Sequence, residues 1–524
     1  MVADAEVIII GSGPAGVSVA FPLVESGVRV LMLDASGSQL PAPPAHSTRE
    51  EWWRDEGRWR SELGAEGVIS GSGLSPKFLT PLSQATVAGF AEAARLEATD
   101  YFPVGSLASG GLSRIWGALA TPYANSDLAL WGDAAPDLEA SYTRVAERIG
   151  LSGEGALASG DPTTLSPPLE RIMTARRHKP EDAGFTLSRA MNAVLTFPHQ
   201  GRGACNSCGL CLYGCSRESI YHSALDIPRL RRFSNFTYRP NTYVTGLDGD
   251  EGVQIVHAQT DGESCSFRSP IAILAAGTLM TTKLALRRLG LTEKRMRLVS
   301  NPVGGAAFIV PGLIGKKLPD RSFGLGQAFY TLNPTVDIEA AGVLYGADTL
   351  PLAFMADRLP FARPTALRLA RALAPAVVLA TAYLPGQFSN NHLIVEAGDS
   401  GGMRVEGGHS SDAEPLLRKT FRSLARQLRR RGAWSVLGSI QILKPGADAH
   451  PSSTLPMGLD DAASTRISGE LKDAPGIYVA DGASLPVLSA RHPTLTIMAN
   501  ADRIGRGITR RLRAEVAEES RARS

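Results

Sequence analysis

Short apolar runs followed by small residues recur along the chain and predict buried strands of a parallel sheet. Glu6–Ile10 is rich in β-branched residues, and Val28–Leu33 repeats the pattern after an apolar stretch that ends near Gly27. Continuous apolar runs of this length are typical of strands buried on both faces, whereas a half-exposed strand alternates apolar and polar residues. The pattern therefore predicts a strand–helix–strand unit in the first part of the chain.

A glycine-rich turn joins the first predicted strand to the helix. It reads Gly11-Ser12-Gly13-Pro14-Ala15-Gly16, and Asp34 follows the second strand. Gly11 permits a tight turn, Gly13 lets the backbone approach a pyrophosphate, and Gly16 allows the helix to pack closely on the strand. The N–H groups at the start of the helix suit phosphates, and Asp34 can accept hydrogen bonds from ribose hydroxyls. The order predicts dinucleotide binding; the alternative is a glycine-rich turn in an ordinary α/β protein.

Two later apolar runs extend this pattern. Ile271–Ala275 leads into Ala276, and Gly476–Ala480 leads into Asp481 and Gly482. A cofactor domain that combines the first 35 residues with a middle strand and a late strand is discontinuous in sequence. The segments inserted between them are therefore expected to form a second domain.

The second domain is expected to contain a sheet and at least one long helix. Ala306–Val310, Gln327–Tyr330 and His392–Glu396 are predicted strands of that sheet. Asp412–Arg431 is predicted to be a helix, because its leucines and a phenylalanine recur on one face, Asp412 can cap its beginning and arginines close its end. Arg506–Ser524 is interpreted as a charged tail.

The composition and charge of the chain argue against several classes of protein. Of the 524 residues, 44% are hydrophobic and 20% are charged, which argues against a disordered chain. The 54 Lys and Arg residues against 51 Asp and Glu leave a formal charge of +3, so nucleic acid or an anionic membrane is not expected as the main partner. No apolar run of about 18 residues predicts a membrane span, and Met1–Ile10 lacks the basic stretch of a signal peptide. A cytoplasmic location is expected.

Taken together, the motifs resemble the glucose-methanol-choline (GMC) oxidoreductase family, which binds FAD. The match follows the family's order over nearly the whole chain, which makes it more specific than any single motif. The blocks that carry it are Gly11–Gly16 with Asp34, Gly110–Gly117, Ala275–Thr278, His450–Gly458 and Asp481–Ala499.

The resemblance implies an α/β fold in which a discontinuous Rossmann-like FAD-binding domain is joined to an α+β substrate domain with an antiparallel sheet. The FAD-binding domain is expected to comprise residues 1–36, 95–125, 200–300 and 446–524, and the substrate domain 126–199 and 301–445. Residues 37–94 are interpreted as an excursion over the cofactor domain and a candidate lid.

Two histidines carry the chemistry that the resemblance implies. His450 begins the segment that is similar to the family's His-Pro-x-x-Thr-x-x-Met-Gly, and His492 lies 42 positions further on, where the family has His or Asn at the flavin's reactive edge. Alcohol oxidation removes a hydride from carbon and a proton from the hydroxyl, and a neutral imidazole can take that proton. His450 is therefore the expected general base and His492 the partner that holds the alkoxide. The alternative for each is an ordinary surface or core histidine.

Further residues are expected to contact the FAD. A helix that begins near Pro493 would direct N–H groups at the flavin. Ile115 stands where some sugar-oxidising relatives carry a histidine that tethers FAD, so non-covalent FAD is expected. For Trp116 a place in the core is the alternative. The candidate contacts outside the first turn are Gly110, Gly111, Ser113, Trp116, Val244, Ala276, Asp481, Gly482, His492, Pro493 and Thr494.

Four of the five cysteines lie in one short loop, at Cys205, Cys208, Cys211 and Cys215. Their C-x2-C-x2-C-x3-C spacing is that of bacterial ferredoxin loops. Some bacterial GMC sugar dehydrogenases bind a three-iron cluster through a C-x5-C-x3-C pattern that this loop also contains. An iron–sulfur cluster is the favoured interpretation, and a four-thiolate zinc site, disulfides and plain thiols are the alternatives.

The expected activity is FAD-dependent oxidation of an alcohol, with hydride passing to flavin N5 and the proton to His450. The resemblance favours a hydroxyl of a sugar, glycoside or aminoglycoside, with O2 or an external carrier as electron acceptor. The alternatives are a long-chain or sterol alcohol dehydrogenase, a non-redox lyase that keeps FAD, and an electron-transfer flavoprotein centred on the cysteines.

Overall fold

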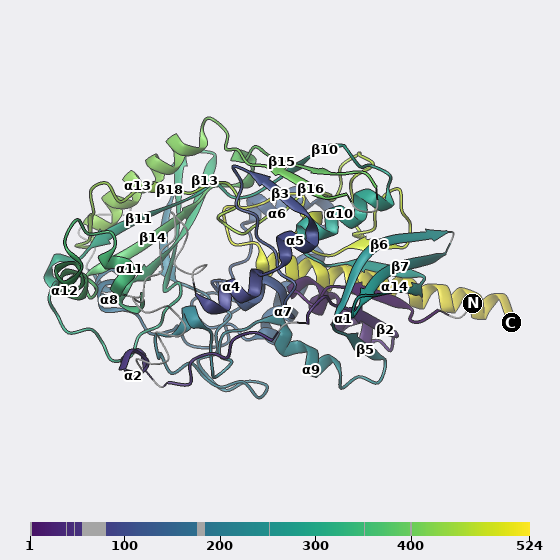
Figure 1. The fold of residues 1–524 in the computed structure, drawn as a ribbon, viewed down its shortest axis with the longest axis horizontal. Coiled ribbons are helices and arrows are strands. Elements are labelled where there is room, and N and C mark those ends of the chain that lie inside the picture. The colour runs from purple at the N-terminus through teal and green to yellow at the C-terminus, as the bar shows by residue number, and fades with distance from the viewer. Residues whose placement is uncertain are drawn as a thin grey trace.

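A parallel sheet of five strands lies toward the right of Figure 1, where β2 and β5 are labelled. The computed structural model describes residues 3–523 except 38, 47, 55–79, 176–183, 251, 351 and 399–400. Every neighbouring pair in this sheet is parallel. The strands, in spatial order, are β19 (Ile477–Val479), β9 (Ile271–Leu274), β1 (Val7–Ile10), β2 (Val30–Leu33) and β5 (Phe236–Arg239). The sheet thus combines the N-terminal strands with the two later apolar runs.

The central strand β1 is apolar throughout because both of its faces are covered. Val7 and Ile9 belong to a buried cluster with α1 (Pro14–Glu25) and α14 (Thr494–Arg523). Ile8 and Ile10 belong to a second cluster, to which α10 (Thr278–Arg288) and the three-stranded sheet of β6–β8 contribute. Alternating side chains therefore enter two different cores, which explains the absence of alternating polarity. The bounds of the three-stranded sheet are β6 (Thr242–Asp250), β7 (Val253–Thr260) and β8 (Glu263–Ser269).

Residues Arg506–Ser524, interpreted as a charged tail, continue helix α14, which runs to Arg523. Ile504 and Ile508 on this helix are 1% exposed and pack in the same core as α1. Asp502 accepts hydrogen bonds from the guanidinium of Arg144 on α7 (Ala135–Ile149). From Arg510 onward almost all described residues are exposed and many are charged, so the end of the helix is a charged extension from the core.

A seven-stranded antiparallel sheet lies at the other end of the molecule (Figure 1). The helix α13 (Ala413–Arg429) packs on it with the predicted stripe, because Leu417, Phe421, Leu424 and Leu428 are all buried among its strands. The predicted strands near 306–310 and 327–330 are both in this sheet. Its members are β17 (Trp434–Ser435), β11 (Val303–Ile309), β14 (Val377–Tyr383), β13 (Ile338–Gly346), β12 (Ala328–Thr335), β4 (Phe185–Arg189) and β18 (Gln441–Ile442).

The predicted strand His392–Glu396 exists but belongs to a different sheet. As β15 (Asn391–Val395) it pairs with β10 (Arg295–Leu298) and β16 (Met403–Glu406), and β16 pairs in parallel with β3 (Leu96–Thr99). Leu393 and Val395 pack in the same core as Ile8, on the cofactor side of the molecule. An apolar pattern predicts a strand and not its partners, which explains this error.

The remaining helices are short. Among the described residues, no helix is both long enough and apolar enough to cross a membrane. The candidate lid, residues 37–94, includes residues 55–79, which lie outside the described residues. The lid, the domain boundaries and the cytoplasmic location stay predictions. These helices are α2 (Arg49–Arg54), α4 (Pro81–Val87), α5 (Phe90–Ala94), α6 (Asn125–Leu128), α8 (Pro167–Thr174), α9 (Ile227–Leu230), α11 (Leu352–Ala356) and α12 (Arg363–Leu373).

Candidate active site

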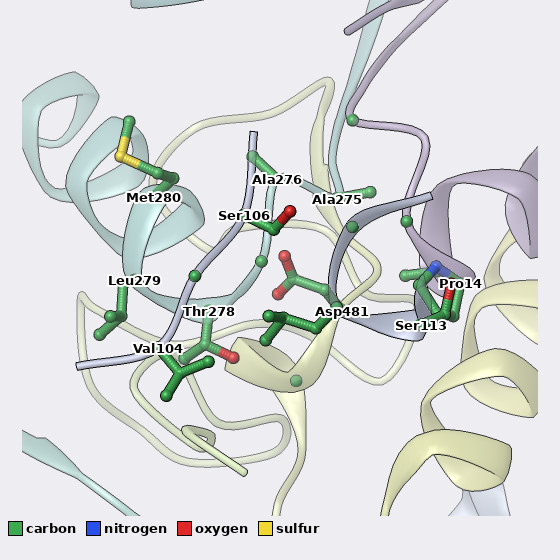
Figure 2. Close-up of a pocket in the computed structure, with 18 of the residues that line it drawn as sticks. Pro14, Val104, Ser106, Ser113, Ala275, Ala276, Thr278, Leu279, Met280 and Asp481 are labelled. Carbon is green, nitrogen blue, oxygen red and sulfur yellow. The ribbon is translucent and has the colours of Figure 1, made fainter. Parts of the chain in front are cut away.

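A cavity of about 260 Å³ opens at the carboxyl ends of β1, β2, β9 and β19. Figure 2 shows side chains from segments far apart in sequence, among them Pro14, Val104, Thr278 and Asp481, around this cavity. Ligands of open parallel sheets bind at this edge of the strands. The residues predicted from sequence that line the cavity are Gly11, Ser12, Gly13, Pro14, Ala15, Asp34, Gly111, Ser113, Trp116, Val244, Ala276, His450, Asp481, Gly482, His492, Pro493 and Thr494.

The three glycines of the first turn do different things. Gly11 has φ of +101°, a backbone conformation that side chains rarely tolerate. A Cβ on Gly16 would lie 1.9 Å from the carbonyl oxygen of Gly11, so this glycine allows helix α1 to approach the turn. A Cβ on Gly13 would meet no atom within 4 Å and would stand in the cavity. Gly16 therefore serves packing and does not line the cavity, whereas Gly13 leaves space for a ligand.

These features fit the pyrophosphate and ribose of FAD. Gly13 precedes the first turn of α1 with ordinary backbone angles (φ −61°), so its N–H and those that follow stand at the positive end of a helix. The carboxylate of Asp34 lines the cavity one strand away. A backbone cradle without side chains beside a buried acid is the arrangement that a dinucleotide requires.

Asp34 is fixed by two hydroxyl groups. Ser12 Oγ donates to its Oδ2 at 2.5 Å, and the hydroxyl of Tyr238 donates to the same atom at 2.7 Å. Burial raises the pKa of Asp34, and these hydrogen bonds act in the opposite direction. Ser12 Oγ also accepts a hydrogen bond from the backbone N–H of Gly110 at 3.0 Å. The acid is thereby tied to the second glycine-rich loop.

The second glycine-rich loop lines the cavity with Gly111, Ser113 and Trp116. Gly110 does not line the cavity, and a Cβ there would lie 2.9 Å from the backbone nitrogen of Ala224, so this glycine allows a close approach of two segments. Ser113 Oγ donates to the carbonyl of Gly110 at 2.6 Å. The indole N–H of Trp116 donates to the carbonyl of Tyr221 at 2.7 Å, while its ring lines the cavity. The side chain of Trp116 is therefore held in the protein interior and at the same time lines the cavity.

On the opposite side, Asp481 follows strand β19 and is buried. Its Oδ2 accepts a hydrogen bond from Thr281 Oγ1 at 2.5 Å, and its Oδ1 accepts one from the backbone N–H of Ala483 at 3.0 Å. Burial raises the pKa of Asp481 to about 6. The carboxyl therefore carries its proton more readily than an ordinary aspartate.

The two predicted histidines meet at the cavity. Their ring centroids are 5.5 Å apart and their planes are 80° to each other. The ring of Tyr383, from β14, lies against both, at 5.8 Å from His450 and 4.8 Å from His492. Helix α14 begins at Thr494, one residue later than the expected Pro493, and its first turn lines the cavity. The fold thus brings together two imidazoles that lie 42 positions apart in the sequence.

Sequence reasoning missed other residues at this site. Thr278 and Met280, at the start of α10, line the cavity, as do Val104 and Ser106 from a preceding loop. Asn301 contacts His450 from 149 positions away and has no local motif to mark it. Asp448 stands two residues before His450, so the neighbouring motif could have drawn attention to it.

The four clustered cysteines lie in a loop whose fold brings their thiols near one another. Burial raises the pKa of Cys205, Cys208 and Cys211, and the neighbouring thiols add to each rise. All five cysteines are among the described residues, and each is a free thiol. No group of three or more His, Cys, Asp or Glu side chains is placed to hold a metal ion in the described part of the chain. The described structure therefore gives no support for a metal at this loop, and the iron–sulfur or zinc site stays a prediction from the cysteine spacing.

Comparison with protein families gives two matches near opposite ends of the chain. Residues 4–52 match the FAD binding domain, which includes the first turn and Asp34. Residues 431–501 match the GMC oxidoreductase family in the segment that carries both histidines.

Two curated proteins are similar over nearly the full length. The chain is 24% identical to 6'''-hydroxyparomomycin C oxidase of Streptomyces lividus, over 98% of this chain and 92% of that protein. It is 23% identical to paromamine 6'-oxidase of Streptomyces fradiae, over 96% of this chain and 91% of that protein.

Solved structures share the fold. Pyridoxine 4-oxidase from Mesorbium loti superposes with a TM-score of 0.62 at 15% identity, over 96% of this chain and 99% of that one. A fungal aryl-alcohol oxidase gives 0.56 at 13% identity, over 98% and 100%. The predicted fold class, a parallel cofactor sheet joined to an antiparallel sheet, is confirmed.

Proposed function

We propose that this chain is an FAD-dependent oxidoreductase of the GMC family that oxidises a hydroxyl group of an aminoglycoside or related glycoside. Support for the substrate class comes from the two Streptomyces oxidases, whose names refer to paromomycin and paromamine and which align over more than nine-tenths of this chain. The family match supports the oxidation of an alcohol, and the two relatives support an aminoglycoside or glycoside as that alcohol.

The observation that carries the proposal is the pair of imidazoles at the mouth of the cofactor cradle. His450 and His492 face one cavity, and the space beside them is continuous with the Gly13 cradle. A carbinol bound between them would have a proton acceptor and a second polar partner on its oxygen. We assign the role of general base to His450 and the holding of the developing alkoxide to His492.

The reaction balances with this chain's residues and one cofactor. The Gly13 cradle and Asp34 would hold FAD, which would supply the acceptor for the hydride of the carbinol carbon. The O–H proton passes to His450 as the C–H bond breaks and the C=O bond forms. His492 holds the oxygen while negative charge develops there, and Tyr383 keeps the two rings at their mutual angle by packing against both. The electrons later pass to O2 or to an external carrier.

The test is anaerobic addition of a panel of aminoglycosides, neutral glycosides and long-chain alcohols to the FAD-loaded protein. We expect the flavin absorbance to bleach with an aminoglycoside or glycoside and the product to contain one carbonyl in place of one hydroxyl. Bleaching by long-chain alcohols alone would contradict the substrate class. Turnover without any bleaching would contradict the redox reaction and favour a lyase. Oxygen uptake compared with dye reduction then identifies the electron acceptor.

A further inference from the structure

We propose that Asn301 fixes the tautomer of His450, so that Nε2 takes the substrate proton, and that the carboxylate of Asp448 stabilises the imidazolium that forms. The inference rests on the proposed role of His450 as general base and adds two positioning residues to it. Neither residue belongs to a motif that the sequence analysis recognised, and both are buried.

The amide of Asn301 has one orientation that satisfies its neighbours. Its Nδ2 donates to the carbonyl oxygens of Leu384 and Ser489, both at 2.8 Å, which uses both amide hydrogens. A flipped amide would place Oδ1 against these two oxygens and lose both hydrogen bonds. Its backbone N–H donates to Asp448 Oδ2 at 2.7 Å, which holds the residue in place. Oδ1 is therefore the atom that faces His450.

The orientation of Asn301 determines where His450 carries its proton. Asn301 Oδ1 lies 2.9 Å from His450 Nδ1 and can only accept a hydrogen bond. In the neutral ring, one nitrogen is a donor and the other an acceptor, so Nδ1 bears the hydrogen. Nε2 then holds the basic lone pair. The substrate hydroxyl proton is thus directed to a single atom.

Asp448 provides the charge that a protonated ring needs. Its Oδ2 lies 3.8 Å from His450 Nδ1, and its side chain is fully buried. Its Oδ1 makes no hydrogen bond of good geometry among the described residues, while the backbone N–H groups of Asn301 and His450 lie close enough to favour the charged carboxylate. An amide such as Asn301 cannot accept the proton, so the positive charge stays on the ring beside this carboxylate. Attraction at this distance in a buried site favours the imidazolium.

The neighbouring groups give the pH dependence a definite sign. Burial raises the pKa of Asp448 to about 7. The other titratable groups packed here are His492, Tyr383 and Tyr101, and burial raises the pKa of both tyrosines, which keeps them neutral. Above pH 7, Asp448 is ionised and its negative charge can stabilise an imidazolium at His450. Flavin reduction is therefore expected to accelerate as pH rises through about 7.

The first test reads the tautomer directly. In ¹⁵N-histidine-labelled holoenzyme, two-bond ¹H–¹⁵N couplings distinguish Nδ1–H from Nε2–H, and His450→Ala identifies the signals of His450. We expect Nδ1–H in the wild type and a shift to Nε2–H in Asn301→Leu. The control is Asn235→Leu, because Asn235 also donates to two backbone carbonyls, of Val24 and Val28. It lies directly before β5 and does not line the cavity. An Nε2–H wild type would overturn the inference even if no Asn301 variant folds.

The second test removes the negative charge of Asp448. Asp448→Asn keeps an acceptor for the backbone of Asn301 while it removes the carboxylate. We expect a lower pKa of His450 by ¹⁵N shift, and a limiting flavin-reduction rate that falls about tenfold or more without a change in half-saturating substrate concentration. An unchanged pH profile and His450 pKa would overturn the role of Asp448. If His450→Ala itself left reduction unaffected, the proposed function would fail, whereas a wrong tautomer in an enzyme that needs His450 defeats this inference alone.

Discussion

The first glycine turn allows a matched pair of substitutions to separate cofactor binding from packing. In Gly16→Ala, the new methyl group would lie 1.9 Å from the Gly11 carbonyl oxygen and 3.0 Å from its carbon, so α1 or the turn must move. Overpacking of this kind costs about 1–3 kcal/mol of stability, and it is present without any ligand. In Gly13→Ala, the methyl group meets nothing within 4 Å and the backbone angles are ordinary, so the apoprotein is expected to lose at most about 1 kcal/mol, because alanine is a poorer N-cap than glycine.

When FAD binding is measured in place of apoprotein stability, Gly13→Ala is expected to have the larger effect of the two substitutions. The Gly13 methyl group stands in the cavity where a pyrophosphate must approach the backbone. Loss of one charge-assisted hydrogen bond costs about 1.5–3 kcal/mol, which corresponds to about 10- to 150-fold weaker binding. Urea denaturation of the apoproteins and calorimetric FAD titration measure the two effects. FAD affinity like wild type in Gly13→Ala would refute the cradle, and an apoprotein of wild-type stability in Gly16→Ala would refute the close approach.

Further predictions concern the acids, the flavin linkage and the thiols. Asp34→Asn is expected to weaken FAD binding by about tenfold or more, because a charged acceptor for ribose hydroxyls is lost; equal affinity in titration would contradict that contact. Because burial raises the pKa of Asp448 to about 7, the folded protein holds a proton that the unfolded chain has lost, so stability falls as pH rises. From pH 5 to pH 8 this amounts to about 3 kcal/mol in urea denaturation, and Asp448→Asn should remove it. Acid precipitation is expected to release free FAD, because Ile115 at the predicted tether position has no nucleophilic atom. The cysteine spacing predicts stoichiometric iron and acid-labile sulfide in anaerobically purified protein, lost in Cys211→Ser; protein without either contradicts a cluster.

The sequence was most informative where local pattern and function coincide. The glycine turn could be predicted because its three glycines follow the strand directly and each meets a known backbone requirement: a tight turn, space for the pyrophosphate and close packing of the helix. His450 and His492 could be predicted because each stands in its own motif, although only the fold brings their rings to 5.5 Å. That β9 and β19 belong with the N-terminal strands could also be predicted, because each apolar run leads into small residues, whereas their order in the sheet comes from the structure.

The remainder depends on contacts between distant segments, which no local pattern encodes. Gly110 packs closely on Ala224, which lies far away in sequence, and no local pattern announces that contact. The charged composition of the end of α14 indicated its exposure and not that it continues a buried helix. Asn301 contacts two backbone carbonyls, of Leu384 and Ser489, together with the carboxylate of Asp448 and the ring of His450, all of them more than 80 positions away.

His450 is the proposed acceptor of the substrate's proton. Anaerobic stopped-flow reduction of FAD-loaded His450→Ala tests this role most directly. The control is His257→Ala, since His257 is a partly exposed histidine paired with Asp248 on the surface. We expect flavin reduction by the bleaching glycoside to slow by about 10²–10⁴ in His450→Ala, with FAD still bound, and to be unchanged in the control. A near-normal rate in His450→Ala with full FAD content would contradict the central claim.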